Sequence, residues 1–297
     1  MTALRRSTFF AFALFVSSSL ALRAQSPVQR ARQLIAADSA SEAVNILNTA
    51  IGSGHDSSSY HLWRAAAYAD QGARANTFNQ VMLTIRIKNE LKQALKLDSN
   101  SVDARSELAR FYLTAPSILG GSFARAEELA KSLSTTSPSR SHGLLGFVAH
   151  HRGDFKTAER EMRAAIAAQP DSAWSYTPLA LLLGEQQRND EAFALWERSA
   201  ALDSMYKDSF MQMGIIGANT GTHLDAAARA LEHYIGNPPR LSDQRNRASA
   251  NNRLGIVYEK LGRLNDARRA YQQAVTLAPT SLTFKTSLKN LGDLDAK

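Results

Sequence analysis

The pattern of apolar and polar positions is clearest over residues 248–281, where it predicts a short helix, a tight turn and a second helix. Leu254 and Tyr258 lie four residues apart, so they share one face of the first helix. Gly255 lets a neighbouring helix approach this face closely because it has no side chain. Gly262 tolerates the left-handed backbone that ends such a helix, and we therefore place the turn there.

The second helix of this unit is predicted from Ala267 and Ala274, which lie seven residues apart and therefore on one face. Their small side chains permit a tight helix crossing, and Tyr271 fills the space between them. Pro279 cannot continue a helix and stops this one. Residues 248–281 thus predict one antiparallel helix pair.

The same arrangement recurs at steps of 34 residues in units that begin at Ser139, Ala173 and Lys207, and the unit at 248 follows after a loop at 236–240. The matching residues are Leu145, Gly146, Gly153, Ala158, Met162, Ala165 and Pro170 in the first unit, Tyr176, Leu179, Ala180, Leu183, Ala192 and Trp196 in the second, and Phe210, Met213, Gly214, Gly221 and Ala226 in the third. A period of this length indicates stacked helical units rather than one central core.

The N-terminal half repeats the pattern more loosely. Residues 102–138 match it with extra residues between the two helices, in the segment TAPSILGGSF. Helices are also predicted over residues 28–37, 41–51, near Tyr68, and over 76–97, and a last one over 282–294. These elements amount to about seven helix pairs and a terminal helix.

The residues of the repeat resemble those of the tetratricopeptide repeat family, except that Asn251 stands where the family has an aromatic residue. The resemblance implies an all-α fold, a right-handed α-α superhelix of about seven antiparallel pairs with a C-terminal capping helix. We assign residues 25–100 to degenerate N-terminal repeats, 101–281 to the repeat array and 282–297 to the capping helix. Gly120, Gly121 and Ser122 resemble an insertion found in some bacterial members.

The first 24 residues have the pattern of a secretory signal peptide. Arg5 and Arg6 precede an apolar run over residues 9–22, and Ala24 offers a small residue for cleavage. The alternative is an uncleaved membrane anchor, but the run is short for a span of about 20 residues. The sequence therefore predicts a periplasmic or secreted protein with no transmembrane span in the mature chain.

The composition of the chain excludes several kinds of site and partner. The chain of 297 residues has no cysteine, which excludes disulfides, zinc ribbons and thiol nucleophiles. The formal net charge is +8, and removal of Arg5, Arg6 and Arg23 with the signal would leave about +5. Because the positive charges are mixed with Asp and Glu rather than gathered in one block, we expect no nucleic-acid partner.

Candidate catalytic groups do not form a constellation. His150 and His151 are adjacent, so their side chains point about 100° apart on a helix and suit one metal ion poorly. The tripeptide from Arg152 to Asp154 falls in a turn where the repeat requires such residues. Gly120 and Gly121 lack the lysine of a phosphate-binding loop. We therefore expect no catalytic residue, no metal and no cofactor.

In the resembling family the first helices line a concave groove, which is the usual binding surface. Carried over position by position, the groove residues are Phe147, His150, His151, Trp174, Thr177, Leu181, Met211, Ile215, Asn252 and Ile256. The hypothesis is that the apolar members form a strip that grips an extended or helical segment of a partner protein. The alternative is that these residues belong to the core.

The function expected on these grounds is a non-catalytic protein–protein interaction scaffold of the cell envelope or exterior, with a protein or peptide in the groove. One alternative is a repeat subunit of an envelope assembly or export machine, serving the outer membrane, pili or polysaccharide. Another is an enzyme of unrecognised type.

Overall fold

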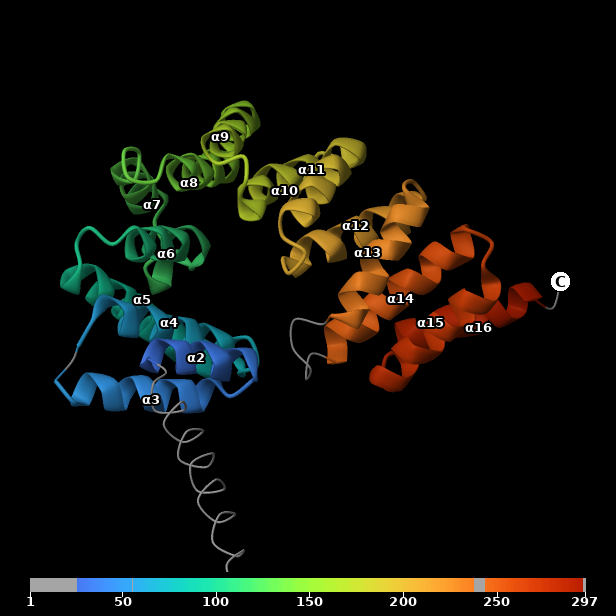
Figure 1. Cartoon of the computed structure of the whole chain (residues 1–297), viewed down its shortest axis with the longest axis horizontal. Coiled ribbons are helices and arrows are strands. Elements are labelled where there is room, and N and C mark those ends of the chain that lie inside the picture. Colours follow the sequence, from blue (N-terminus) through green and yellow to red (C-terminus); the bar gives the residue numbers. More distant parts are fainter. Residues whose placement is uncertain (1–25, 55, 238–243, 296–297) are drawn as a thin grey trace, which may run out of the picture. The chain divides into compact units, whose positions relative to one another are not determined.

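A computed structural model describes residues 26–54, 56–237 and 244–295, and every regular element within these ranges is helical (Figure 1). The predicted signal peptide lies outside the described residues. The α-helices are α2 (Pro27–Ala36), α3 (Ala40–Gly52), α4 (Ser58–Gly72), α5 (Thr77–Leu97), α6 (Val102–Thr114), α7 (Phe123–Ser132), α8 (Pro138–His151), α9 (Phe155–Ala168), α10 (Thr177–Glu185), α11 (Asn189–Leu202), α12 (Lys207–Thr220), α13 (Leu224–Gly236), α14 (Gln244–Lys260), α15 (Leu264–Leu277) and α16 (Leu282–Asp295). Two short 3-10 helices, η1 (Ser117–Leu119) and η2 (Ala173–Tyr176), complete the set.

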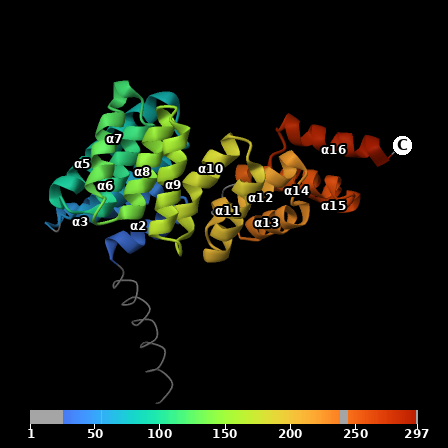
Figure 2. The same cartoon turned by 90° about the horizontal axis from the view of Figure 1, so that it is seen from above.

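Within the described ranges the helices follow one another as seven pairs and a final single helix, which confirms the predicted fold class. The two members of a pair pack on each other, as α4 does on α5, α8 on α9 and α14 on α15. Neighbouring pairs also touch: α7, α8 and α9 lie side by side (Figure 2), and α16 packs on α15. A helix pair therefore buries its apolar face against its own partner and the next pair, as a repeat stack requires.

The chain divides into two compact units, residues 1–104 and 105–297, which are described separately. The first unit holds α2 to α5 around a core that includes Leu47, Tyr68 and Leu83. Its first helix begins with a capping box, in which the Ser26 hydroxyl accepts from the Gln29 N–H and the Gln29 side chain accepts from the Ser26 N–H. The second unit holds the remaining helix pairs.

One continuous core in the second unit extends over the helix pairs from α8 to α15. It includes Met162 of α9, Trp196 of α11, Leu231 of α13 and Tyr271 of α15, all at most 2% exposed. These are residues of the second helices, packed on the small residues of the first. A Cβ on Gly255, for example, would lie 2.4 Å from the Tyr271 ring, so only glycine permits this approach.

In the second unit, the turn between the helices of a pair contains a residue with left-handed backbone. Gly262 has φ 73° and Gly153 has φ 77° at corresponding places in their units. The unit that begins at Ala173 has Gln187 at this place, with φ 61°. The left-handed conformation therefore comes from the geometry of the repeat and is adopted even where the residue is not glycine.

Asn251, the departure from the aromatic residue of the family, is buried at 6% exposure. Its side-chain amide donates to the Arg247 carbonyl at 2.9 Å, one turn earlier in α14. A polar side chain at this place is thus satisfied within its own helix.

The glycine-containing insertion has a steric explanation. After η1 the backbone of Gly120 is left-handed, and the Ser122 N–H donates to the Tyr112 carbonyl at 2.8 Å. A Cβ on Gly121 would lie 1.8 Å from the Ala115 carbonyl oxygen. The two glycines therefore let the chain fold back on the end of α6 before Ser122 caps α7.

Candidate functional site

The ten predicted groove residues all lie in the second unit, on the first helices α8, α10, α12 and α14 or on η2. The apolar members Phe147, Trp174, Met211, Ile215 and Ile256 are half-buried, and Leu181 is 39% exposed. Asn252 is the exception, because it is 8% exposed and its Oδ1 has no hydrogen-bond partner.

Residues of the same helices that point the other way are fully enclosed. Leu179, two residues before Leu181, is 3% exposed, and Met213, two residues before Ile215, is 6% exposed. Phe147, Met211 and Ile256 rest with one side against this core. Each first helix therefore presents a core face and a separate, partly accessible apolar face.

Side-chain contacts link two of the predicted groove residues, Trp174 and Thr177, to neighbouring first helices. The Arg140 guanidinium of α8 lies 6.0 Å from the centre of the Trp174 ring in η2, within the range of a cation–π contact. The Thr177 and Tyr206 hydroxyls are hydrogen-bonded at 2.8 Å, which links α10 to the start of α12. Burial raises the pKa of Tyr206, and the hydrogen bond to Thr177 partly opposes this.

The two adjacent histidine rings meet edge to face, with centroids 5.7 Å apart, but their other contacts differ. His150 Nε2 lies 2.6 Å from the Glu185 carboxylate of α10, whereas the His151 ring stacks on Phe123 with centroids 5.1 Å apart. His142 pairs with Glu161 at 2.8 Å. Within the described ranges, no three His, Asp or Glu side chains are grouped closely enough to hold a metal ion.

The tripeptide from Arg152 to Asp154 is engaged in local structure. Arg152 forms an ion pair with Glu127 at 2.6 Å, and the Asp154 carboxylate accepts from the Thr157 N–H at 3.0 Å to cap α9. That backbone hydrogen bond lowers the pKa of Asp154. Both charged side chains of the tripeptide thus have partners inside the second unit.

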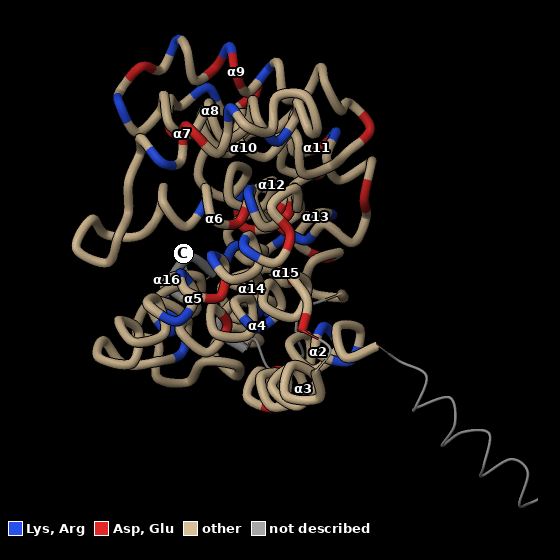
Figure 3. Tube along the Cα trace, turned by 90° about the vertical axis from the view of Figure 1, so that its left-hand side faces the viewer, with Lys and Arg blue, Asp and Glu red and all other residues tan. Residues whose placement is uncertain are grey.

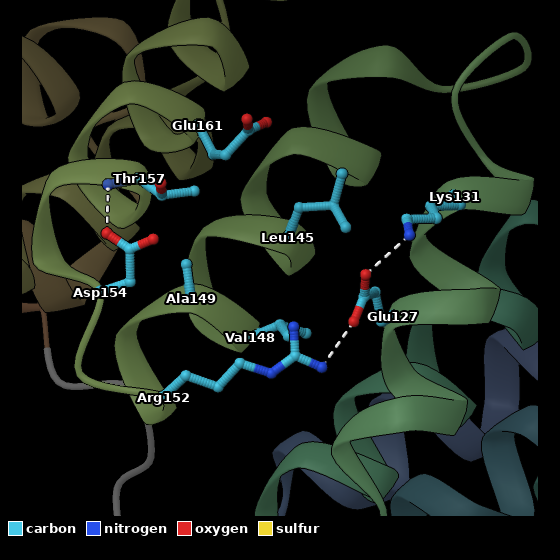
Figure 4. A pocket seen from close by; sticks show the side chains of 9 residues that line it. All are labelled: Glu127, Lys131, Leu145, Val148, Ala149, Arg152, Asp154, Thr157 and Glu161. Carbon is cyan, nitrogen blue, oxygen red and sulfur yellow. Dashed lines mark hydrogen bonds and ion pairs between the residues drawn. The ribbon is translucent and has the colours of Figure 1, made fainter.

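A trough that sequence analysis missed lies beside these residues, between α7 and α9 over α8 (Figure 4). Its volume is about 240 Å³, and its floor is formed by Leu145, Val148 and Ala149. Glu127 is paired with Lys131 as well as with Arg152, and these contacts lower its pKa. Because its acidic groups are satisfied by neighbouring donors, the trough offers little to recognise a ligand.

Charge and hydropathy add two observations. Basic and acidic residues are interspersed along the helices (Figure 3). No helix in the described part of the chain is both long and apolar enough to cross a membrane.

Together these features define an all-α protein of stacked helix pairs, with a partly apolar face along its first helices. Residues 248–281 match the model of the tetratricopeptide repeat family. The chain therefore contains a tetratricopeptide repeat over these residues, and the predicted resemblance to this family is confirmed.

One solved structure shows the same fold. The chain is similar to the APC/C hetero-tetramer Cut9–Hcn1, with 12% identity and a TM-score of 0.58; the match covers 89% of this chain and 48% of that chain. It is also similar to YrrB, described as a TPR protein with an unusual peptide-binding site, at 16% identity and TM-score 0.49, over 67% of this chain and 97% of that one. The C-terminal part of a TPR repeat-containing protein from Cytophaga hutchinsonii matches at 14% identity and TM-score 0.49, over 88% and 99% of the two chains. No curated protein matches the chain.

Proposed function

We propose that the chain is a non-catalytic interaction scaffold of the cell envelope or exterior, which binds a segment of a partner protein along the first helices of its second unit. The observation that supports this most is the row of half-exposed apolar side chains on four successive first helices. A buried core would have enclosed them, and a surface facing only water would have replaced most of them by polar residues.

The chemistry of the row suits an extended or helical segment with apolar side chains. Phe147 and Trp174 offer large, rigid ring surfaces, of the kind that supply much of the energy of a protein interface. The partner would contact side chains that already pack against the core on one side, so these side chains lose little conformational freedom on binding.

The proposed location rests on the N-terminal segment alone. Its two arginines, apolar run and Ala24 favour export. Fractionation of the source cells, with antibody against the second unit, tests this: recovery only with cytoplasmic markers would contradict an envelope or external location.

The groove is tested by site-specific photo-crosslinking in the source cells. A benzophenone amino acid at Leu181 should give a crosslink to one defined segment of a partner protein. Leu264 is a matched control, because it is 37% exposed but belongs to the second helix α15. A crosslink from 264 alone, or the same products from both positions, would refute binding in the groove.

Stability separates a groove role from a core role. Combined replacement Phe147→Ala and Trp174→Ala should abolish the crosslink from position 181 while lowering the melting temperature only slightly. If the double variant instead melts far below the parent protein, these residues are part of the core and the proposal fails.

A further inference from the structure

The first half of α5, in the first unit, carries an apolar face that faces away from the core. Phe78 is 75% exposed, Val81 38%, Met82 43% and Ile85 37%. Their spacing of three, four and seven residues places them on one side of the helix. The opposite side, with Leu83 and Leu91, is buried.

A helix that packs against the core along one side needs apolar residues on that side alone. The exposed side chains of α5 are consecutive on its surface rather than scattered, which is uncommon unless another molecule covers them. None of the four belongs to the core cluster of the first unit or packs against it, so the core does not require apolar side chains at these places.

A trough runs along this face. Phe78, Met82 and Leu83 of α5 line it together with Gln71 and Ala75 from the end of α4 and the following turn, and its volume is about 470 Å³. The α5 residues on one side and Gln71 and Ala75 on the other form a concave apolar surface, with the Gln71 side-chain amide at its edge. Such a shape accepts bulky side chains of a helix laid along α5.

The charge beside the apolar face has one sign. The Arg86 guanidinium lines the trough and lies 5.6 Å from the centre of the Tyr68 ring. Lys92 and Lys96 are exposed further along the helix. The acidic residue of α5, Glu90, is turned to the core side, where it contacts His61 at 2.6 Å and Arg64 at 2.7 Å.

We propose that the first half of α5 and the trough beside it are a second docking site, for an amphipathic helix of a partner protein that carries acidic side chains next to its apolar face. The apolar side chains of that helix fill the trough, and its carboxylates pair with Arg86 and Lys92. A second copy of this chain fits poorly, because two α5 helices would bring the same positive charges together. The concave trough also favours a helix over a flat anionic membrane.

The test is a binding titration of the full chain with two fluorescein-labelled synthetic helices. One has leucine at positions spaced three, four and seven apart with flanking glutamates, and its twin has lysine in place of every glutamate. In fluorescence anisotropy the acidic peptide should bind at least about tenfold more tightly than the basic twin. The variant Arg86→Glu should remove that preference.

Apolar contact is tested by Phe78→Ser with Met82→Ser, which should weaken binding of the acidic peptide by about tenfold or more. Leu97→Ser is the matched control, because Leu97 is 42% exposed on the same helix but lies outside the trough. It should bind like the parent protein, and so should Leu181→Glu, whose change is confined to the groove of the second unit.

Four results would each overturn the proposal. The first is that neither peptide binds, and the second is that the Phe78 and Met82 changes leave binding of the acidic peptide intact. The third is a dimer in analytical ultracentrifugation that these changes dissociate. The fourth is flotation with anionic phosphatidylglycerol vesicles that depends on the same residues. The third would assign the face to a second copy and the fourth to a membrane. Failure of the proposed groove function would leave these outcomes unchanged.

Discussion

Gly255 provides the sharpest quantitative test of how the second unit is packed. In Gly255→Ala the new methyl carbon would lie 2.4 to 2.8 Å from three atoms of the Tyr271 ring. The ring cannot move aside easily, because Tyr271 is 1% exposed and its hydroxyl donates to Glu259 at 2.9 Å. Overpacking of this kind costs about 1–3 kcal/mol, and the short contacts favour the upper end.

Helix propensity acts in the opposite direction and must be subtracted. Replacing glycine by alanine inside a helix contributes about 1 kcal/mol of stability. We therefore expect Gly255→Ala to lower the free energy of unfolding by about 1–2 kcal/mol. For a unit of this size the melting temperature should fall by roughly 2–8 °C, measured by circular dichroism at 222 nm.

Gly143 is the matched control. It also lies in a first helix, α8, but a Cβ there would meet nothing within 4 Å. Gly143→Ala should therefore raise the melting temperature, since only the propensity term acts. If Gly255→Ala is as stable as the parent protein, or if both variants lose stability equally, close approach of the helices is not what requires glycine at this place.

Two further predictions concern the backbone and pH. Gln187 has φ 61°, a left-handed conformation that glycine adopts more readily, so Gln187→Gly should raise the free energy of unfolding by about 0.5–1 kcal/mol in urea titrations. Gly153→Ala should lower it by about 1 kcal/mol for the same reason. A loss of stability in Gln187→Gly would contradict the reasoning. Burial and the hydrogen bond to the Glu232 carboxylate raise the pKa of Tyr258 to about 12, so the unfolded chain ionises first and stability should fall as the pH rises from 10 to 12. The melting temperature of Tyr258→Phe should fall less steeply over this range, and an equal slope would refute the assignment.

The fold was predictable from sequence because the same close packing of the first helix on the second recurs from unit to unit. The close contact of Gly255 with Tyr271 recurs between Gly146 and Met162, and both pairs are visible as a spacing in the chain. Helix ends were also predicted closely, since the first pair, expected over residues 28–37 and 41–51, is observed over Pro27–Ala36 and Ala40–Gly52.

Features that depend on three-dimensional contact were less accessible. The ion pair of His150 with Glu185 joins residues 35 positions apart on different helices, and no local pattern marks it. The neighbouring His151 stacks on Phe123 of α7. Adjacent residues of one helix turn can therefore have unrelated partners, and their chemistry cannot be deduced from adjacency.

The exposed face of α5 escaped prediction for a related reason. In the second unit the register of the repeat gives each first-helix residue an expected place in the core or in the groove, although Asn252, expected in the groove, is buried. No such register extends over residues 77–97, and Phe78, Val81, Met82 and Ile85 are indistinguishable in composition from a buried stripe. Amphipathic spacing identifies residues that share a face, whereas only the neighbouring helix decides whether that face is covered. The two apolar surfaces consequently rest on independent evidence, and a variant at Leu181 and one at Phe78 should each remove a single binding activity.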